Sequence, residues 1–308
     1  MIEQSTYQKS KKTRKKLITQ LINRPLFLLD SSAKKYYERA FHCSSILQQE
    51  GTSLKSHYCN SRTCITCNGK RTAAYIKHYG SQVLALNDAQ FVTLTAKTVE
   101  CYDSDTLRYF IDQRESVWRK IYKNANKCNR KLVGMKSMEI TARPDNHYHI
   151  HFHFIIEGKE NAEWVKSQWL KHYTNAEHYL QKIKPIKDEN SLLEVFKYGT
   201  KFADKEKVKV KGKIVERWKR VPPERTDLII RALMKKRLIS LFGGIRKIET
   251  EDVNEMDNDQ IIDMEDKVCE SWIWNNIDWF CASTGEKFSN YILSEELKRV
   301  FDIGYSPP

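Results

Sequence analysis

The stretch from His147 to Ile156 alternates strictly between polar and apolar side chains over its first eight positions. Histidine stands at every second position, and the residues in between are Tyr148, Ile150, Phe152 and Phe154. Successive side chains of a β-strand point to opposite faces. The period of two therefore predicts a strand that packs its apolar side chains into a core and presents a row of histidines on its other face.

Such a row of histidines is typical of a metal site. Alternate residues of a strand lie about 7 Å apart, so two neutral imidazoles can reach one divalent ion. The alternative is an exposed histidine-rich face without a ligand, but four of the nine histidines in register favour the metal. A preceding strand at residues 134–142 and a turn at Pro144 predict a hairpin that brings Glu139 near the row. The pattern alone leaves the face of Glu139 open.

The rest of the chain predicts both strands and helices. We expect a basic, partly disordered arm at 1–24, strands at 90–96 and 134–142, a basic hairpin at 205–220 and an acidic linker at 249–266. We expect helices at 25–58, 70–80, 104–128, 161–180, 190–204 and 226–240. The aromatic run WIWNNIDWF near the end predicts a further packed helix. Strand, helix, hairpin and helix in this order indicate an α+β fold with a central antiparallel β-sheet and helices on one face.

Charge is distributed unevenly along the 308 residues. Residues 249–308 hold 15 acidic and 4 basic side chains, a net of −11, whereas the whole chain carries +14, which leaves about +25 for the first 248 residues. A body this basic is suited to neutralising phosphates, although a surface that serves only solubility is the alternative. The sequence has neither a long apolar run nor an apolar signal segment, so we expect no membrane contact and a cytoplasmic location.

Four of the eight cysteines are spaced as metal ligands. Cys59, Cys64 and Cys67 form a C-x4-C-x2-C cluster, and Cys43 lies upstream. Four thiolates can close a tetrahedral zinc site, and such closed sites are structural. His42 and His57 remain alternative ligands. In a reducing compartment we expect thiols or ligands rather than disulfides, and the scattered Cys101, Cys128, Cys269 and Cys281 read as small hydrophobic residues.

A third feature is the segment from Ser191 to Asp204. On a helix, Glu194, Tyr198 and Lys201 would share one face. A tyrosine hydroxyl becomes a competent nucleophile when a metal and a nearby cation polarise the phosphate that it attacks. Glu194 could accept a proton and Lys201 could hold a phosphate. The alternatives are a capping box from Ser191 to Glu194, a half-buried Tyr198 and a solvated Lys201.

These motifs, in this order over residues 40–250, resemble the rolling-circle replication initiators of small Gram-positive plasmids, the plasmid Rep family of the HUH endonuclease superfamily. The motifs that carry the resemblance are YCNSRTCITCNGKR for the zinc region, FVTLTA, HIHFHFII for the metal motif, EVFKYGTK for the tyrosine motif, and KRLISLFGGIRK. The resemblance implies a metal pair at His151 and His153, with His149 next. Ile150 stands where the family usually has a proline. His147 is an additional histidine, and we leave it out of the predicted set of metal ligands.

The resemblance also implies a mechanism and partners. Mg²⁺ or Mn²⁺ held by the histidines and an acidic ligand would polarise the scissile phosphate, Tyr198 would attack it to form a 5′-phosphotyrosine and a 3′-OH primer, and Glu194 would activate water at termination. The partners would be plasmid origin DNA with a single-stranded or hairpin nick site, a host helicase and a polymerase. The oligomeric state stays open, with a dimer as one option.

In this interpretation the chain has a basic arm (1–24), a zinc-binding region (25–88), an HUH nicking-joining domain (89–248) and an acidic C-terminal extension (249–308). Phosphate contacts cannot specify a sequence, so base contacts would come from loops or from the 205–220 hairpin.

The rival hypotheses are a related transposase or relaxase and a non-enzymatic, zinc-containing DNA-binding regulator. The regulator would explain the charge and the cysteines but not the histidine row.

Overall fold

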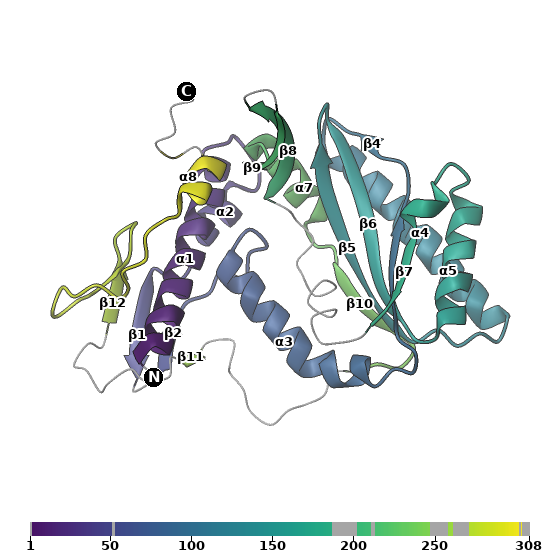
Figure 1. Ribbon diagram of the computed structural model, residues 1–308, viewed down its shortest axis with the longest axis horizontal. Helices are drawn as coiled ribbons and strands as arrows, with labels where there is room; N and C mark the ends of the chain where they lie inside the picture. Colours follow the sequence, from purple (N-terminus) through teal and green to yellow (C-terminus); the bar gives the residue numbers. More distant parts are fainter. Residues whose placement is uncertain are drawn as a thin grey trace. The chain divides into compact units, whose positions relative to one another are not determined.

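The computed structural model describes residues 2–50, 53–186, 202–210, 213–246, 258–260, 271–301 and 303. The chain divides into two compact units (Figure 1). The first unit comprises residues 1–71, 202–224 and 251–308, and the second comprises residues 72–201 and 225–250. Helix α3 (Ile65–Leu84) contributes to both.

The second unit is built on a six-stranded antiparallel sheet. Its strands are β3 (Gln90–Thr95), β4 (Val99–Glu100), β5 (Gly134–Arg143), β6 (His147–Ile156), β7 (Lys182–Pro185) and β10 (Ile239–Phe242). The strand order is β10-β5-β6-β3-β7, and β4 pairs with β6. The long pairing of β5 with β6 sets Glu139 opposite His151. The predicted strands at 90–96 and 134–142 and the histidine strand are confirmed.

The turn between β5 and β6 explains why this hairpin forms. Asp145 and Asn146 have φ values of 55° and 56°, in the left-handed region that Asp and Asn tolerate best among non-glycine residues. Two consecutive residues of this kind match the right-handed twist of a hairpin. The turn predicted after Pro144 is therefore present, and it fixes which residues of the two strands face each other.

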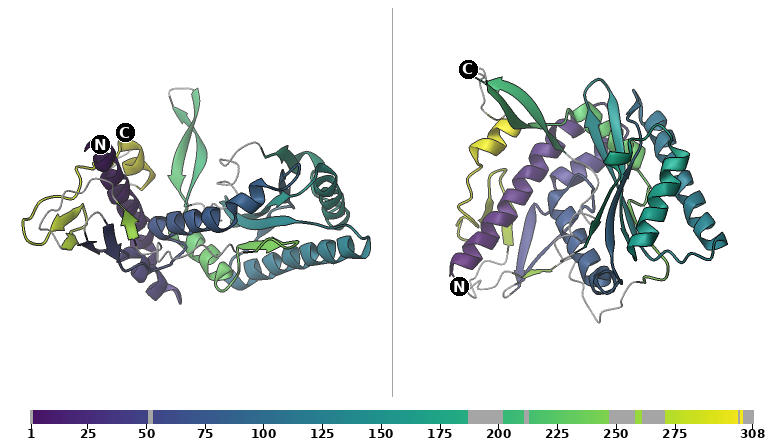
Figure 2. Two further views of the ribbon diagram at one scale, coloured as in Figure 1. Left: turned by 90° about the horizontal axis from the view of Figure 1, so that it is seen from below. Right: turned by 45° about the vertical axis from the view of Figure 1, so that its right-hand side comes forward.

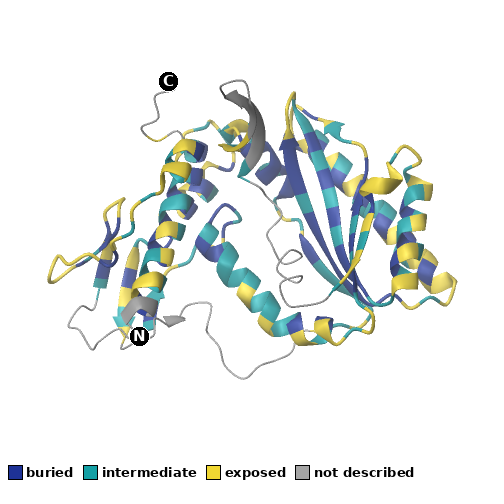
Figure 3. Cartoon of the chain, in the orientation of Figure 1, coloured by how far each residue is buried: buried dark blue, intermediate teal, exposed yellow. Residues whose placement is uncertain are grey.

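Helices cover the apolar face of the sheet. On this face β6 carries Phe152 and Phe154, both almost fully buried, and Figure 3 shows the resulting stripes along the strand. Helix α4 (Ser104–Lys127) sets the Trp118 ring 4.6 Å from that of Phe154, and α5 (Lys159–His172) sets the Trp169 ring 5.7 Å from that of Phe152. Aromatic pairs at these separations add to the stability gained from burial.

The prediction of helices on one face is incomplete. The C-terminal part of α3 packs on one end of the opposite face, where Val83 joins a cluster with Met135, Ile155 and Ile239. Ile155 follows the histidines on the same face of β6, because it lies two residues beyond His153. One end of the histidine face is therefore covered and apolar. The architecture is α+β with antiparallel sheets, as predicted.

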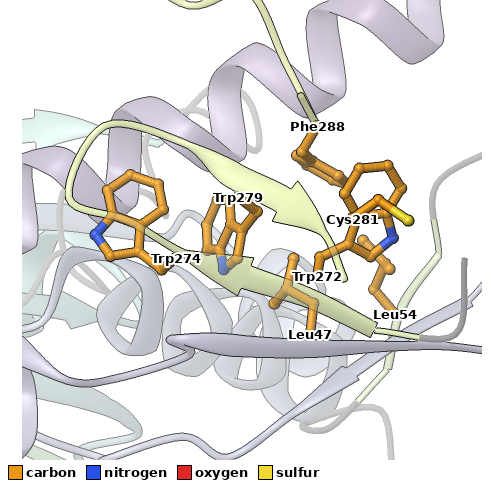
Figure 4. Close-up of a cluster of buried hydrophobic side chains, with 7 residues drawn as sticks. All are labelled: Leu47, Leu54, Trp272, Trp274, Trp279, Cys281 and Phe288. Carbon is orange, nitrogen blue, oxygen red and sulfur yellow. The ribbon is translucent and has the colours of Figure 1, made fainter. Parts of the chain in front are cut away.

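The first unit holds a second sheet, in the order β11-β2-β1-β12-β13. Its elements are α1 (Ile2–Phe27), α2 (Lys34–Phe41), β1 (Ile46–Glu50), β2 (Ser53–Ser56), β11 (Asn258–Gln260), β12 (Ser271–Trp274), β13 (Trp279–Cys281) and α8 (Glu295–Val300). The buried cluster on this sheet contains three tryptophans, together with Phe288 from the segment after β13 (Figure 4). β8 (Ala203–Val210) and β9 (Lys213–Arg220) form a separate two-stranded sheet (Figure 2), which confirms the predicted basic hairpin.

The expectation of a partly disordered arm at 1–24 is wrong, because helix α1 spans Ile2–Phe27. The lysines of this helix lie over aromatic rings: Lys9 over Phe288 at 5.6 Å, Lys12 over Trp279 at 6.0 Å and Lys16 over Trp274 at 5.6 Å. Long cationic side chains can bury their apolar stems in this way while the ammonium group faces the ring. A run of lysines that looks solvated in the sequence therefore packs against a core.

Three other expected elements also differ. The aromatic run near the end forms strands β12 and β13 instead of a helix, since Trp272 and Trp274 are buried and Ile273 between them is half exposed. The helix expected at 25–58 is divided among α2, β1 and β2. The helix expected at 226–240 is α7 (Pro223–Leu233), which ends before β10.

Cys281 is disulfide-bonded, against the expectation of a thiol.

Two adjacent glycines in the KRLISLFGGIRK block provide a matched test of this fold. Gly243 and Gly244 both have positive φ, 76° and 102°, but a Cβ on Gly243 would lie 2.3 Å from the Leu132 carbonyl oxygen, whereas one on Gly244 meets nothing within 4 Å. We expect Gly244→Ala to cost about 1–2 kcal/mol of unfolding free energy from backbone strain. Gly243→Ala should cost about 1–3 kcal/mol more. Urea denaturation measures both, and equal losses would contradict the packing described.

Candidate functional site

The histidine face of β6 lies between two polar strand segments. Thr95 and Thr93 of β3 are opposite His151 and His153, and on the other side Thr141 and Glu139 of β5 are opposite His149 and His151. All four histidines are half-buried, whereas the alternate residues are fully buried. The face is therefore a partly exposed polar surface on a buried apolar support.

His153 has a defined set of neighbours. Its Nδ1 lies 3.2 Å from the Thr93 hydroxyl oxygen, and its Nε2 lies 3.4 Å from a carboxylate oxygen of Glu139. The ring stacks on Phe91 with a centroid distance of 5.6 Å. A histidine that is held through one nitrogen has a fixed orientation for the other. The Nε2 of His153 is therefore directed to the same point as the Glu139 carboxylate.

His149 and His151 continue the row. Their ring centroids are 4.0 Å apart, and the ring of His151 is parallel to that of His153 at 6.0 Å. The His149 Nε2 is hydrogen-bonded with the hydroxyl of Thr95. Burial, and then the charges of Arg143 and Arg114, lower the pKa of His149 below its ordinary value. A depressed pKa keeps the imidazole neutral at physiological pH, which is the form that binds metals.

His147 differs from the other three. Its Nδ1 lies 2.8 Å from the backbone oxygen of Asp145, in the turn that begins the strand. The ring is thereby tied to the turn at the end of the row.

Two donors on this face are spaced like two ligands of one divalent cation. Two ligand atoms bound to one ion at about 2.1 Å lie about 3 Å apart in octahedral geometry. The 3.4 Å between His153 Nε2 and the Glu139 oxygen is close to that value. His151, opposite Glu139 in register, is the next donor along the strand. Imidazole and carboxylate together suit Mn²⁺, and carboxylate also suits Mg²⁺.

The predicted tyrosine segment cannot be placed relative to this face. Glu194, Tyr198 and Lys201 lie outside the residues that the structure describes, as does most of the helix expected at 190–204. The described chain ends at residue 186, just after β7, and resumes at residue 202, just before β8.

The four cysteines form a second candidate site, in the first unit. Cys43 follows α2, Cys59 lies between β2 and α3, and Cys64 and Cys67 lie at the start of α3. Their sulfur atoms all lie within 4.8 Å of one another, and both Cys43 and Cys59 have Sγ atoms 3.6 Å from that of Cys67. Four sulfurs around one zinc ion at about 2.3 Å lie about 3.8 Å apart.

The chemistry of the cluster also fits zinc. Hydrogen bonding from Cys59 lowers the pKa of Cys43, which favours a thiolate there. The hydrogen bond with Cys43 raises the pKa of Cys64, so the protons are shared within the cluster. A metal ion replaces such protons with its own charge. The cluster could hold a metal such as zinc, and its four protein ligands leave no open position for catalysis.

Lys16 is a buried cation beside this cluster. It is 1% exposed, and its Nζ donates to the backbone oxygens of Phe41 and Cys43 at 3.0 and 2.6 Å and to the hydroxyl of Ser45 at 3.0 Å. Burial lowers the pKa of Lys16 to about 8, although the nearby cysteine sulfurs act to raise it. The ammonium group is therefore mostly protonated at neutral pH. Sequence reasoning missed Lys16, because it is one lysine in a run of basic residues.

One comparison with known proteins gave a match. A family model described as replication protein matches residues 51–280. The chain belongs to this family. Membership supports a role in the initiation of plasmid replication, and a replication initiator is expected to bind origin DNA. The comparison with curated proteins gave no match, and neither did the comparison with solved structures.

The family match spans the histidine strand, the segment with Glu194 and Tyr198, the basic hairpin and three of the four clustered cysteines. Cys43 lies before its first residue. Among the described residues, no helix is long and apolar enough to cross a membrane.

Lys16 allows a test of the zinc site. Four thiolates around Zn²⁺ carry a formal charge of −2, which a buried ammonium group partly offsets. We expect Lys16→Met to weaken zinc retention by about 10- to 100-fold, in the range typical of groups behind metal ligands. The measurement is the transfer of zinc to a colorimetric chelator at fixed pH. Lys12→Met is the control, because Lys12 is also buried on α1 but lies over Trp279. Equal zinc loss in the two variants would argue against this role.

Proposed function

We propose that this replication protein initiates plasmid replication by cutting one strand of the origin with Tyr198 as the nucleophile, in the manner of the HUH endonucleases. The proposal rests first on the convergence of His153 Nε2 and the Glu139 carboxylate at 3.4 Å, on a sheet face that also carries His149 and His151. Family membership supplies the plasmid context. The basic first 248 residues supply the attraction for DNA.

The histidine face would hold Mg²⁺ or Mn²⁺ through His151, His153 and Glu139, with His149 as a further ligand. When bound, such an ion withdraws charge from the scissile phosphate. The residues of the chain orient and protect this site: Thr93 and Phe91 fix the ring of His153, and Thr95 fixes that of His149. Apolar side chains pack behind β6 and against its end at Ile155.

The covalent step is a transesterification at phosphorus. The Tyr198 hydroxyl oxygen forms a bond to the phosphorus atom while the bond from phosphorus to the 3′ oxygen breaks. The phenolic proton passes to Glu194 or water, and the departing 3′ oxygen takes a proton from solvent. The products are a 5′-phosphotyrosine and a 3′-OH that primes synthesis. Lys201 would stabilise the negative charge, and Glu194 would activate water when the cycle ends.

Tyr198 is the residue that tests this function. Wild-type protein with Mn²⁺ should convert a supercoiled plasmid carrying its cognate origin to open circles and leave protein covalently bound to a 5′ end. Tyr198→Phe should lower both products by at least about 10³-fold, because the nucleophilic oxygen is lost. Denaturing gels that resolve the covalent adduct provide the measurement.

Tyr179→Phe is the matched control, since Tyr179 is 72% exposed and lies outside the motif. Nicking by Tyr198→Phe at the wild-type rate would exclude Tyr198 as the nucleophile. If wild-type protein binds the origin without nicking it, the chain is a zinc-containing DNA-binding regulator and the enzyme proposal fails.

A further inference from the structure

The strand ladder beside His149 is interrupted. β3 pairs with β6 as far as Thr95, and β4 resumes the pairing with β6 at Val99. His149 lies between these two pairings along β6, and residues 96–98 connect the two strands. The imidazole of His149 is hydrogen-bonded with the hydroxyl of Thr95 and with the backbone of Ala96. The orientation of this ring therefore depends on the path of the chain as it leaves β3.

Two buried side chains hold the backbone of Thr95. Strand β7 pairs with β3 from Gln90 to Thr93, so it ends before it reaches Thr95. In place of a strand, the Thr95 N–H donates to Oε1 of Gln181 at 2.8 Å, and the Thr95 backbone oxygen accepts from Nε1 of Trp169 at 2.9 Å. Gln181 is 3% exposed and Trp169 is fully buried. Both polar backbone groups of Thr95 are thus satisfied by side chains.

Gln181 is itself held on its other side. It lies between the short helix η1 (His178–Leu180) and β7, and its Nε2 donates to the backbone oxygen of Glu177 at 2.9 Å. An amide side chain offers both an acceptor and donors, and here one bond is made in each direction. Gln181 therefore links the start of η1 to the end of β3.

A third buried side chain holds the chain two residues beyond Thr95. Arg114 of α4 is 4% exposed, and its Nη2 donates to the backbone oxygen of Lys97 at 2.7 Å. Within the described part of the chain, its Nε and Nη1 atoms have no hydrogen-bond partner. Burying a guanidinium group with so few bonds costs free energy. This cost indicates that the contact with Lys97 has a purpose besides packing.

We propose that three buried side chains act as positioning residues for His149 by holding the backbone of residues 95–97, namely those of Gln181, Trp169 and Arg114. They fix the backbone from the side of the helices, and the Thr95 hydroxyl passes this constraint to the imidazole. The proposal rests on the proposed function for its purpose, since an imidazole held in one orientation is prepared to bind a metal ion. The positioning itself requires no metal.

Gln181→Met tests this positioning, because methionine keeps the length of the side chain and loses the amide. The probe is diethyl pyrocarbonate, which modifies accessible imidazoles, applied at fixed pH to zinc-loaded protein without added Mn²⁺ and followed by mass spectrometry of peptides. His149 should react about 2- to 10-fold faster in Gln181→Met than in the wild-type protein, the factor that corresponds to the loss of one hydrogen bond. Thr95→Val should give the same increase, and the double variant should add nothing further.

Two further variants separate positioning from a loss of stability. Gln181→Glu keeps an acceptor for the Thr95 N–H, so His149 should react nearly as in the wild-type protein. Gln90→Met is the matched control, because Gln90 is also 3% exposed and hydrogen-bonded, with Asp88, but lies at the other end of β3. It should lower the free energy of unfolding in urea as Gln181→Met does, and leave the reaction of His149 unchanged.

Gln181→Asn provides a milder second variant, since its amide is one methylene shorter and cannot keep both bonds. An unchanged reaction of His149 in both Gln181→Met and Gln181→Asn would overturn the proposal. An equal increase in Gln90→Met would also overturn it, because the effect would then follow stability alone.

Mn²⁺ affinity separates this proposal from the proposed function. Gln181→Met should weaken Mn²⁺ binding by about 2- to 10-fold, but not in a His149→Ala background. If the wild-type protein binds no Mn²⁺ while Gln181→Met still accelerates the reaction of His149, the proposed metal site fails and the positioning stands. If Mn²⁺ binds but the reaction of His149 is the same in Gln181→Met and the wild-type protein, the positioning proposal fails alone.

Discussion

The register of β6 between β5 and β3 is the constraint on which the candidate catalytic face depends. Burial of Phe152 and Phe154 against Trp118 and Trp169 fixes which face of the strand is inside. A shift of one residue would exchange the two faces and bury the histidines. Burying one large apolar side chain stabilises the fold by about 1.5–3 kcal/mol. The shift would expose several such side chains, so its cost would be several times this free energy. The position of each histidine is thus a consequence of the packing behind it.

The same register assigns partners to the histidines. Glu139 is opposite His151 in the register, and its carboxylate reaches the Nε2 of His153 at 3.4 Å. Thr93 and Thr95 occupy the corresponding positions on the other side. The face therefore combines imidazole and carboxylate groups with hydroxyl groups that contact the histidines. In the first unit, the four cysteines are brought together by α2, by a loop and by α3, with Lys16 of α1 beside them.

Part of this arrangement was predictable from the sequence. A strict period of two identified β6 and its two faces, and cysteine spacing identified the four-cysteine cluster, because both signals are local and strong. The face of Glu139 was not predictable, since it depends on the pairing register with β5. The role of α1 was missed because a helix with many lysines looks solvated, while its stems in fact pack over tryptophans. The strands β12 and β13 were missed because their short alternation was read as helical.

Metal binding by the histidine face is the central claim, and Mn²⁺ affinity tests it most directly. Electron paramagnetic resonance of free Mn²⁺ in a titration of zinc-loaded protein should reveal a site that His153→Ala weakens by at least about 10-fold, because one ligand and the partner of Glu139 are lost. His147→Ala should leave the affinity unchanged, since His147 is opposite Arg143 at the turn end of the row, four residues from the position opposite Glu139. Unchanged Mn²⁺ binding in His153→Ala, or equal losses in both variants, would contradict the account.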